Sequence, residues 1–274
     1  MPSRIYLVGN GASLKNTNLD LLAGQPSMAV NKIHKLYPYT TWRPTHYVKV
    51  DYSAFDPDNW KKEILQHAHL GEQCLLWNAF RAGAEKADGN YEFIHEGIGD
   101  FFNVRYIPRC KHHYLRTGEW HNICTGLNSI LTMAIWAVEL GFEEIVLVGC
   151  DGRFSTPPED HFIEGYYKTW DPDYAERNNQ NIRMAHEVIA QHCPVPVLDA
   201  TVGGHLDCYP KVRLEDVIQQ EPLHRSAPDR KGDETGSQVG QANPEVQPKK
   251  DSRLDRRPGR SAGTRKPVRK KRDG

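Results

Sequence analysis

Two glycines and two polar residues near the start of the chain have the spacing of an anion-binding turn. Gly9, Asn10 and Gly11 directly follow the apolar run 5–8, and Ser13 comes two positions later. Glycine allows backbone angles that other residues avoid, and it lets a ligand approach the main chain. A buried strand that ends in such a turn, followed by exposed N–H groups, is typical of a phosphate site. The same residues also suit a plain strand-to-helix turn in which the glycines serve geometry alone.

The turn departs from two familiar nucleotide-binding motifs. Leu14 stands where the dinucleotide fingerprint G-x-G-x-x-G needs its third glycine. The chain also contains no G-x-x-x-x-G-K-[ST] sequence. The sequence therefore excludes a P-loop ATPase.

A second group of candidate ligand-binding residues flanks an apolar helix predicted over residues 127–140. Thr125 and Gly126 precede this helix, where a hydroxyl and free N–H groups suit an anion. Asp151 follows the apolar strand predicted over 145–149, where a carboxylate can bind ribose hydroxyls or a metal ion. Asp151 could instead be a turn former before Gly152.

The elements that must position these residues are short apolar strands that alternate with helices. Continuous apolar runs suit strands buried on both faces, and we expect an α/β fold: a Rossmann-like, mostly parallel sheet with helices on both faces. Ligands of such sheets gather beyond the carboxyl ends of the strands. Further strands are predicted over 27–30, 44–50, 74–77 and 194–198, and helices over 19–22, 174–192 and 214–219. Four polar residues each follow a strand: Asn10, Asn31, Asp51 and Asp151.

Two polar stretches interrupt this pattern. Glycines break residues 79–120, which we interpret as a mobile loop or lid. Residues 153–173 are rich in Pro, Tyr and Trp, as substrate loops are, and His161 is the only histidine among them.

Composition divides the chain into a globular domain, residues 1–220, and a tail, residues 221–274. Residues 225–274 hold 15 basic and 7 acidic residues, and residues 1–224 hold 20 basic and 28 acidic ones. The tail has no aromatic residue, so we expect it to be disordered. Its basic end predicts peripheral contact with anionic membranes rather than specific nucleic-acid binding, since no aromatic side chain stacks on bases. The sequence predicts a soluble, cytoplasmic protein of unknown oligomeric state, because no leader and no C-x-x-C spacing is present.

The order and spacing of these motifs resemble two related families over residues 4–220. One is the bacterial family 42 sialyltransferases. The other is the group named after archaeal 6-hydroxymethylpterin diphosphokinase, whose members often lie in surface-polysaccharide gene clusters, which points to polysaccharide biosynthesis. The residues that carry the resemblance are Gly9-Asn10-Gly11-Ala12-Ser13-Leu14-Lys15, Asn31, Cys124-Thr125-Gly126 and the segment 140–151.

The sialyltransferase resemblance implies a transferase that uses a CMP-sugar donor and a surface-glycan acceptor, with no cofactor required. It implies that Asn10, Ser13 and Asn31 meet the donor's nucleotide and phosphate, and that Asp151 meets the nucleotide. By position, His161 matches the histidine that serves as general base in that family. Imidazole has a pKa near ~6.5, which suits removal of a proton from an attacking hydroxyl at neutral pH.

Two alternatives remain open at this point. Asp51 stands where the sialyltransferases carry Asn, and Asp51 with Asp151 would suit Mg²⁺. This pair indicates Mg²⁺-dependent pyrophosphoryl transfer from ATP to a pterin-like hydroxymethyl acceptor. The other alternative is a non-catalytic nucleotide-binding module that localises through its basic tail.

Overall fold

The computed structural model describes residues 4–50, 60–77, 105–107, 128–154, 161–163, 166 and 172–220. Its centre is a seven-stranded sheet in the order β5-β4-β3-β2-β1-β6-β7. All six neighbouring pairs are parallel. The strands are β1 (Arg4–Val8), β2 (Ser27–Val30), β3 (His46–Lys49), β4 (Cys74–Trp77), β5 (Arg105–Ile107), β6 (Glu144–Val148) and β7 (Val197–Asp199). The predicted α/β sheet is confirmed, and every pairing is parallel rather than most of them.

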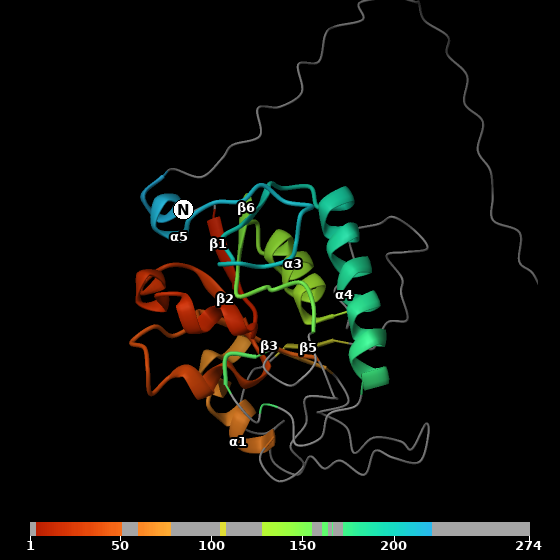
Figure 1. The fold of residues 1–274 in the computed structure, drawn as a ribbon. Coiled ribbons are helices and arrows are strands. Elements are labelled where there is room, and N and C mark those ends of the chain that lie inside the picture. Colours follow the sequence, from red (N-terminus) through yellow and green to blue (C-terminus); the bar gives the residue numbers. More distant parts are fainter. Residues whose placement is uncertain are drawn as a thin grey trace, which may run out of the picture. The chain divides into compact units, whose positions relative to one another are not determined.

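Helices cover both faces of this sheet (Figure 1). The α-helices are α1 (Trp60–Leu65), α3 (Ser129–Glu139), α4 (Pro172–His192) and α5 (Leu214–Gln219). Four 3₁₀ helices join them: η1 (Ala12–Asn16), η2 (Leu19–Leu22), η3 (Asn31–Leu36) and η4 (Ala68–Gln73). Figure 1 shows α3 and α4 on one side of the sheet and the 3₁₀ helices with α1 and α5 on the other. Because both faces are covered, β1 and β6 are buried along their whole length.

Helix α3 shows how the sequence sets the limits of an element. The Asn128 side chain accepts a hydrogen bond from the Leu131 amide at 2.9 Å, so the helix begins at Ser129 rather than at residue 127. Gly141 ends it with φ of 85°, a left-handed conformation in which glycine has no Cβ clash. Seven consecutive residues of α3, 131–137, are buried. Such a helix, apolar on all sides, packs between the sheet and α4.

The strand order places the switch point of the sheet between β1 and β6. From β1 the chain moves outward through β2, β3, β4 and β5, and it then returns to β6 on the other side of β1. The two strands pair in register from Arg4 with Glu144 to Val8 with Val148, so they end together. Open α/β sheets bind their ligands in the crevice beyond such a point. Among the helices that the structure describes, none is long and apolar enough to cross a membrane.

Several predicted features lie outside the described residues. They are Asp51, Thr125, Gly126, most of the stretch 79–120, and the tail 221–274. The other predicted site residues are described, and they are Gly9, Asn10, Gly11, Ser13, Asn31, Asp151 and His161.

Candidate functional site

The turns that follow β1 and β6 are packed directly against each other. The Gly9 amide donates to the Val148 carbonyl at 2.8 Å, and the Gly11 amide donates to the Gly149 carbonyl at 2.9 Å. A Cβ atom on Gly9 would lie 2.4 Å from the Gly149 carbonyl oxygen. A Cβ on Gly11 would lie equally close to the Asp151 carboxylate. Both glycines therefore have a packing role, which is the geometric alternative that the sequence left open.

Asp151 occupies the position at the start of η1 where the sequence predicts an external anion. Its carboxylate accepts one hydrogen bond from the Ser13 amide at 3.0 Å and another from the Ser13 hydroxyl. Its backbone carbonyl also accepts a hydrogen bond from the His205 amide at 2.8 Å. Hydrogen bonds from N–H and O–H donors to a carboxylate are among the stronger hydrogen bonds in proteins. Asp151 thereby fixes the first turn of η1 against the end of β6.

Asn10 and Asn31 place two amide groups at the neighbouring ends of β1 and β2. The Asn10 side-chain nitrogen donates to the Val30 carbonyl at 2.9 Å, so Asn10 reaches across to the end of β2. The side-chain oxygens of both asparagines are buried, and neither has a hydrogen-bond donor among the residues that the structure describes. A buried acceptor without a partner costs about 1–3 kcal/mol. Each of these two oxygens therefore has the capacity to accept a further hydrogen bond.

The backbone at Asn31 is strained as well. Its φ is 52°, and it is the one non-glycine residue with positive φ in the described part of the chain. Asparagine tolerates this left-handed region better than most residues. The Tyr47 hydroxyl donates to the Asn31 carbonyl at 2.9 Å and helps to hold the backbone there. Strain of this kind clusters at ligand-binding sites.

His161 lies beside the glycine turn, although 150 positions separate it from Gly11 in the sequence. Gly11 and His161 form an antiparallel bridge, and the Phe162 amide donates to the Asn10 carbonyl at 3.3 Å. The His161 ring stacks on the Tyr166 ring with centroids 3.9 Å apart. Burial, reinforced by the nearby Lys32 charge, lowers the pKa of His161 to about 3. The imidazole is therefore neutral at pH 7.

Lys32 also lies at the candidate site, although no motif in the sequence singled it out. Its side chain is buried, its ammonium group donates to the Tyr166 carbonyl at 2.8 Å, and it lies 5.1 Å from the centre of the Tyr166 ring. A lysine is almost never fully buried unless its charge is paired or put to use. Its signal in the sequence is its place directly after Asn31, at the carboxyl end of a strand.

Helix α4 contacts His161 indirectly, through Phe154. The Asn179 side chain accepts a hydrogen bond from the Phe154 amide at 2.6 Å and donates one to the Phe154 carbonyl at 3.0 Å. The Phe154 ring lies 5.5 Å from the His161 ring, measured between centroids. Asn179 thus holds the segment that follows Asp151 in a fixed position beside the histidine.

The described residues supply one of the two carboxylates that the sequence predicts as Mg²⁺ ligands. Asp151 is in place, and its two oxygens already accept hydrogen bonds from Ser13, whereas Asp51 lies outside the described residues. Within the described ranges, no three His, Cys, Asp or Glu side chains come together in a way that could hold a metal ion.

Comparisons with known proteins find similarity at the level of structure only. No family model matches the sequence, and no curated protein does. One similar solved structure is the sialyltransferase CstII from Campylobacter jejuni in complex with cytidine-5'-monophosphate, at 15% identity and a TM-score of 0.41, covering 76% of this chain and 84% of that one. Another is CST-II in complex with a trisaccharide acceptor and CMP, at 14% identity and a TM-score of 0.41, covering 76% of this chain and 85% of that one. A third is an apo α-2,3-sialyltransferase from Campylobacter jejuni, at 13% identity and a TM-score of 0.41, covering 82% of this chain and 86% of that one.

These structures are sialyltransferases, the enzyme class that the sequence motifs resemble. The resemblance to the diphosphokinase group has no counterpart among them. Because the TM-scores lie below 0.5, the fold assignment rests on the sheet topology of this chain.

Proposed function

We propose that this chain is a transferase that uses a nucleotide-activated donor, a CMP-sugar, and moves the sugar to a hydroxyl group of a glycan acceptor. The donor would lie beyond the ends of β1, β2 and β6. Gly9, Gly11 and Ser13 shape its binding site, and Asn10, Asn31 and Asp151 provide polar contacts. Thr125 and Gly126 remain the predicted ligands of its phosphate or of an acidic sugar.

The observation that carries this proposal is the pair of buried amide oxygens on Asn10 and Asn31. Both need hydrogen-bond donors, and the described residues supply none. A fully ionised phosphate offers only acceptors, whereas a nucleotide adds ribose hydroxyls and, in cytidine, an amino group. A nucleotide would therefore remove an unsatisfied-acceptor cost of about 1–3 kcal/mol for each asparagine.

His161 would act as the general base of the transfer. The acceptor oxygen attacks the anomeric carbon of the sugar, and the bond from that carbon to the phosphate oxygen breaks. The electron pair of the broken bond leaves with CMP, and the acceptor's proton moves to the neutral His161 ring. General-base catalysis of this kind contributes about 10²–10⁴-fold to a rate.

Lys32 would stabilise negative charge near the same ring. In the ligand-free protein its positive charge helps to keep the pKa of His161 low. A bound phosphate would offset that charge and raise the pKa of the histidine toward the value at which a base works best at neutral pH. Binding of the donor would thus make His161 a better base for the transfer.

A thermal-shift panel on the full chain tests the donor class. The ligands are CMP, CDP, UDP, GDP, AMP and ATP, each with and without Mg²⁺. A ligand at 100 times its dissociation constant adds about 2.7 kcal/mol to the stability of the folded state, which is a readily measured shift. The proposal expects CMP to stabilise the protein without metal.

The same panel separates the alternatives. Stabilisation by ATP alone, dependent on Mg²⁺, would replace the proposal with pyrophosphoryl transfer and would make Asp51 and Asp151 the residues of interest. Stabilisation by CMP with no turnover of any CMP-sugar would point to the non-catalytic nucleotide-binding module. The absence of a shift with every nucleotide would overturn the proposal.

A further inference from the structure

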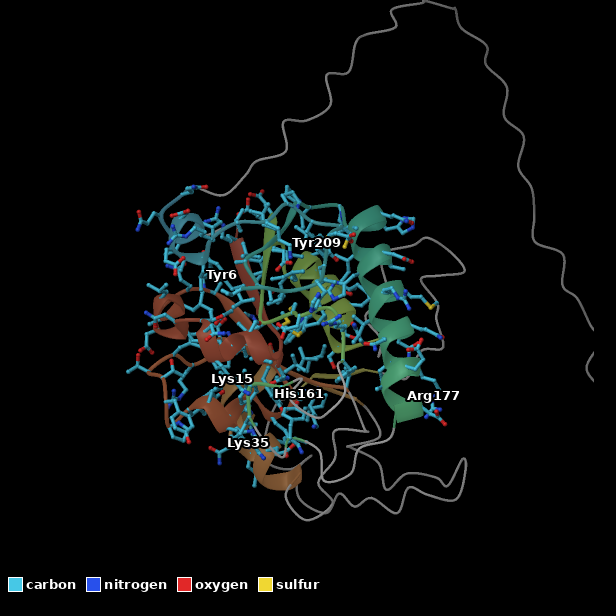
Figure 2. All side chains as sticks on the ribbon, in the orientation of Figure 1. Tyr6, Lys15, Lys35, His161, Arg177 and Tyr209 are labelled. Atoms are coloured by element: carbon cyan, nitrogen blue, oxygen red, sulfur yellow. The ribbon has the colours of Figure 1, made fainter. Side chains whose placement is uncertain are left out.

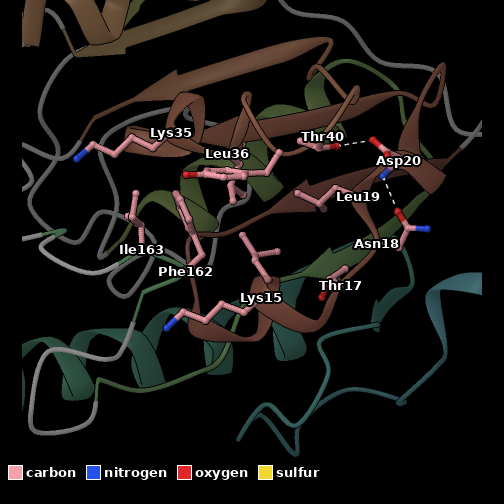
Figure 3. A pocket seen from close by; sticks show the side chains of 12 residues that line it. Lys15, Thr17, Asn18, Leu19, Asp20, Lys35, Leu36, Thr40, Phe162 and Ile163 are labelled. Carbon is pink, nitrogen blue, oxygen red and sulfur yellow. Dashed lines mark hydrogen bonds between the residues drawn. The ribbon is translucent and has the colours of Figure 1, made fainter.

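A pocket of about 530 Å³ lies next to the candidate site, between η1, η2, η3 and the segment 161–163 (Figure 3). Phe162 and Ile163, which line it, directly follow His161 in the chain. Leu14 and Lys15, which also line it, directly follow Ser13. Consecutive Cα atoms are about 3.8 Å apart, so the pocket begins within one or two residues of the proposed base.

Two lysines give one end of this pocket a positive charge. Lys15 is exposed and Lys35 is half-buried, and both line the pocket. Figure 3 shows their side chains pointing the same way, on either side of Phe162 and Ile163. In the part of the chain that the structure describes, neither ammonium group has a carboxylate within ion-pair distance. Figure 2 places both lysines and His161 toward the end of the molecule at which the strands end.

The carboxylate in the pocket lining lies away from these lysines and is already engaged. Asp20 accepts hydrogen bonds from the Thr40 hydroxyl at 2.6 Å, the Thr41 amide at 2.7 Å and the Thr41 hydroxyl at 2.9 Å. Figure 3 shows Asp20 at the opposite end of the pocket from the ammonium groups of Lys15 and Lys35. The lysine end is therefore free to attract an anion.

The remaining lining combines apolar and polar surfaces in a way that suits a sugar. Leu14, Leu36 and Phe162 supply apolar contact, and Thr17 and Asn18 supply hydrogen-bonding groups. Tyr39 also lines the pocket and is 79% exposed, so that much of its surface is available for contact. A sugar ring has apolar faces and a rim of hydroxyl groups, which match these two kinds of surface. Mostly apolar pockets with a few placed polar groups are typical of small-ligand sites.

We propose that this pocket holds an acidic sugar unit of the acceptor glycan, with its carboxylate or phosphate group at the Lys15 and Lys35 end. The inference rests on the proposed function, because it places the acceptor's reacting hydroxyl at His161 and the neighbouring acidic unit in the pocket. The enzyme would thereby select anionic acceptors over neutral ones.

Binding of three matched monosaccharides to the full chain tests the pocket by NMR titration. Galactose is the neutral probe. In galacturonic acid a carboxylate replaces the hydroxymethyl group of galactose, and in galactose 6-phosphate a phosphate is attached to that same group. We expect an acidic probe to bind more tightly than galactose, and we expect its affinity to fall as salt is raised from about 50 to about 300 mM, since surface charges are screened over a few ångströms at the higher value. The two acidic probes distinguish a carboxylate acceptor from a phosphorylated one.

Substitution of the lysines identifies the site of binding. The double variant Lys15→Gln and Lys35→Gln should bind the acidic probe at least about fivefold more weakly than the unaltered protein, the loss expected from one exposed ion pair of about 1 kcal/mol. The control is Arg183→Gln, which removes a positive charge from an exposed position on α4 and should leave binding unchanged. Equal binding of acidic and neutral probes, or unchanged acidic-probe binding in the double variant, would overturn the inference.

A parallel CMP titration separates this inference from the proposed function. The double variant should bind CMP as well as the unaltered protein does, because neither lysine belongs to the nucleotide site. If CMP fails to bind the unaltered protein, the proposed function fails, and the acceptor assignment that rests on it fails with it. If CMP binds but the acidic probes show no dependence on the lysines, only the pocket assignment fails.

Discussion

Ser13 donates both its backbone amide and its hydroxyl to the carboxylate of Asp151, across a sequence separation of 138 residues. This contact joins the turn after β1 to the turn after β6 at the switch point of the sheet. The Ser13 side chain is buried, so neither of its donors has ready access to water. The strength of this contact determines how rigidly the candidate nucleotide site is held before a ligand arrives.

Replacing Asp151 by Asn should destabilise the protein by roughly 1–3 kcal/mol. The amide nitrogen of Asn cannot accept a hydrogen bond, so one buried Ser13 donor would lose its partner. Urea unfolding measures the change. Asp207→Asn is the control, because Asp207 is exposed and its substitution should stay within about 0.5 kcal/mol. Equal stability of the two variants would contradict a structural role for the Ser13–Asp151 contact.

Replacing His161 by Gln should lower sugar transfer by about 10²–10⁴-fold and leave CMP affinity nearly unchanged. The reason is that the imidazole takes a proton in the transition state and has no assigned contact with the nucleotide. Turnover is measured with the donor that the nucleotide panel identifies. His192→Gln, at the exposed end of α4, is the control and should keep full activity. Full activity in His161→Gln would remove this residue from the mechanism.

Six of the seven strands could be predicted from the sequence, because continuous apolar runs mark strands that are buried on both faces. The exception is β5, which lies in the stretch 79–120 that the sequence indicated as a loop or lid. Residues 27–30, 74–77 and 214–219 form the predicted elements at the predicted bounds. Asn18 caps η2 by accepting a hydrogen bond from the Asp20 amide. In each case the feature that predicts the element is local in the sequence: an apolar run, a capping side chain or a glycine at the end of a helix.

The convergence of the site could not be predicted in the same way. The bridge between Gly11 and His161 joins residues that are 150 positions apart, and no local sequence pattern encodes such a contact. Lys32 was missed because a charged residue after a strand usually faces water, whereas here the chain folds over it. The short helices α1 and η3 were missed because one or two turns are too short to show a helical period.

The protein should lose stability as the pH falls from about 7 toward 4. Burial lowers the pKa of His67 to about 3 and that of His186 to about 4, whereas an unfolded chain has a histidine pKa near ~6.5. Below that value the unfolded state binds protons that the folded state does not, so each histidine reduces the free energy of unfolding by up to about 1.4 kcal/mol per pH unit. The loss for each histidine ends near its folded-state pKa.

Urea unfolding measures this slope at several pH values from about 7.5 down to about 4. This range begins above the histidine pKa of an unfolded chain and covers most of the pH interval in which the loss is expected. The variant His67→Gln should show a shallower slope, because one proton-linked group is removed. His69→Gln is the matched control, since His69 lies two residues further along the chain and is exposed. A slope identical in all three proteins would show that His67 is not responsible for the acid sensitivity.

Arg4 and Glu144 form a buried ion pair at the first register position of β1 and β6. Arg4 also donates to the carbonyls of Val217 and Gln220, so this one side chain holds α5 against the sheet. Glu144→Gln should cost about 3–5 kcal/mol, because it leaves a buried charge without its partner. The double variant Arg4→Met and Glu144→Leu should recover part of that loss in urea unfolding. A double variant that is no more stable than Glu144→Gln would contradict direct coupling between the two residues.

Replacing Asn31 by Gly should separate stability from nucleotide binding. Glycine adopts φ of 52° without strain and removes the buried oxygen that lacks a donor, so the ligand-free protein should unfold at an equal or higher temperature. CMP affinity should fall by roughly tenfold, the equivalent of one lost hydrogen bond of about 1.4 kcal/mol. Asn18→Gly, in which an exposed cap is lost, should instead lower stability by a few tenths of a kcal/mol and leave CMP affinity intact. If Asn31→Gly is destabilised and binds CMP normally, Asn31 is a structural turn residue, and the strain at the end of β2 does not serve the nucleotide.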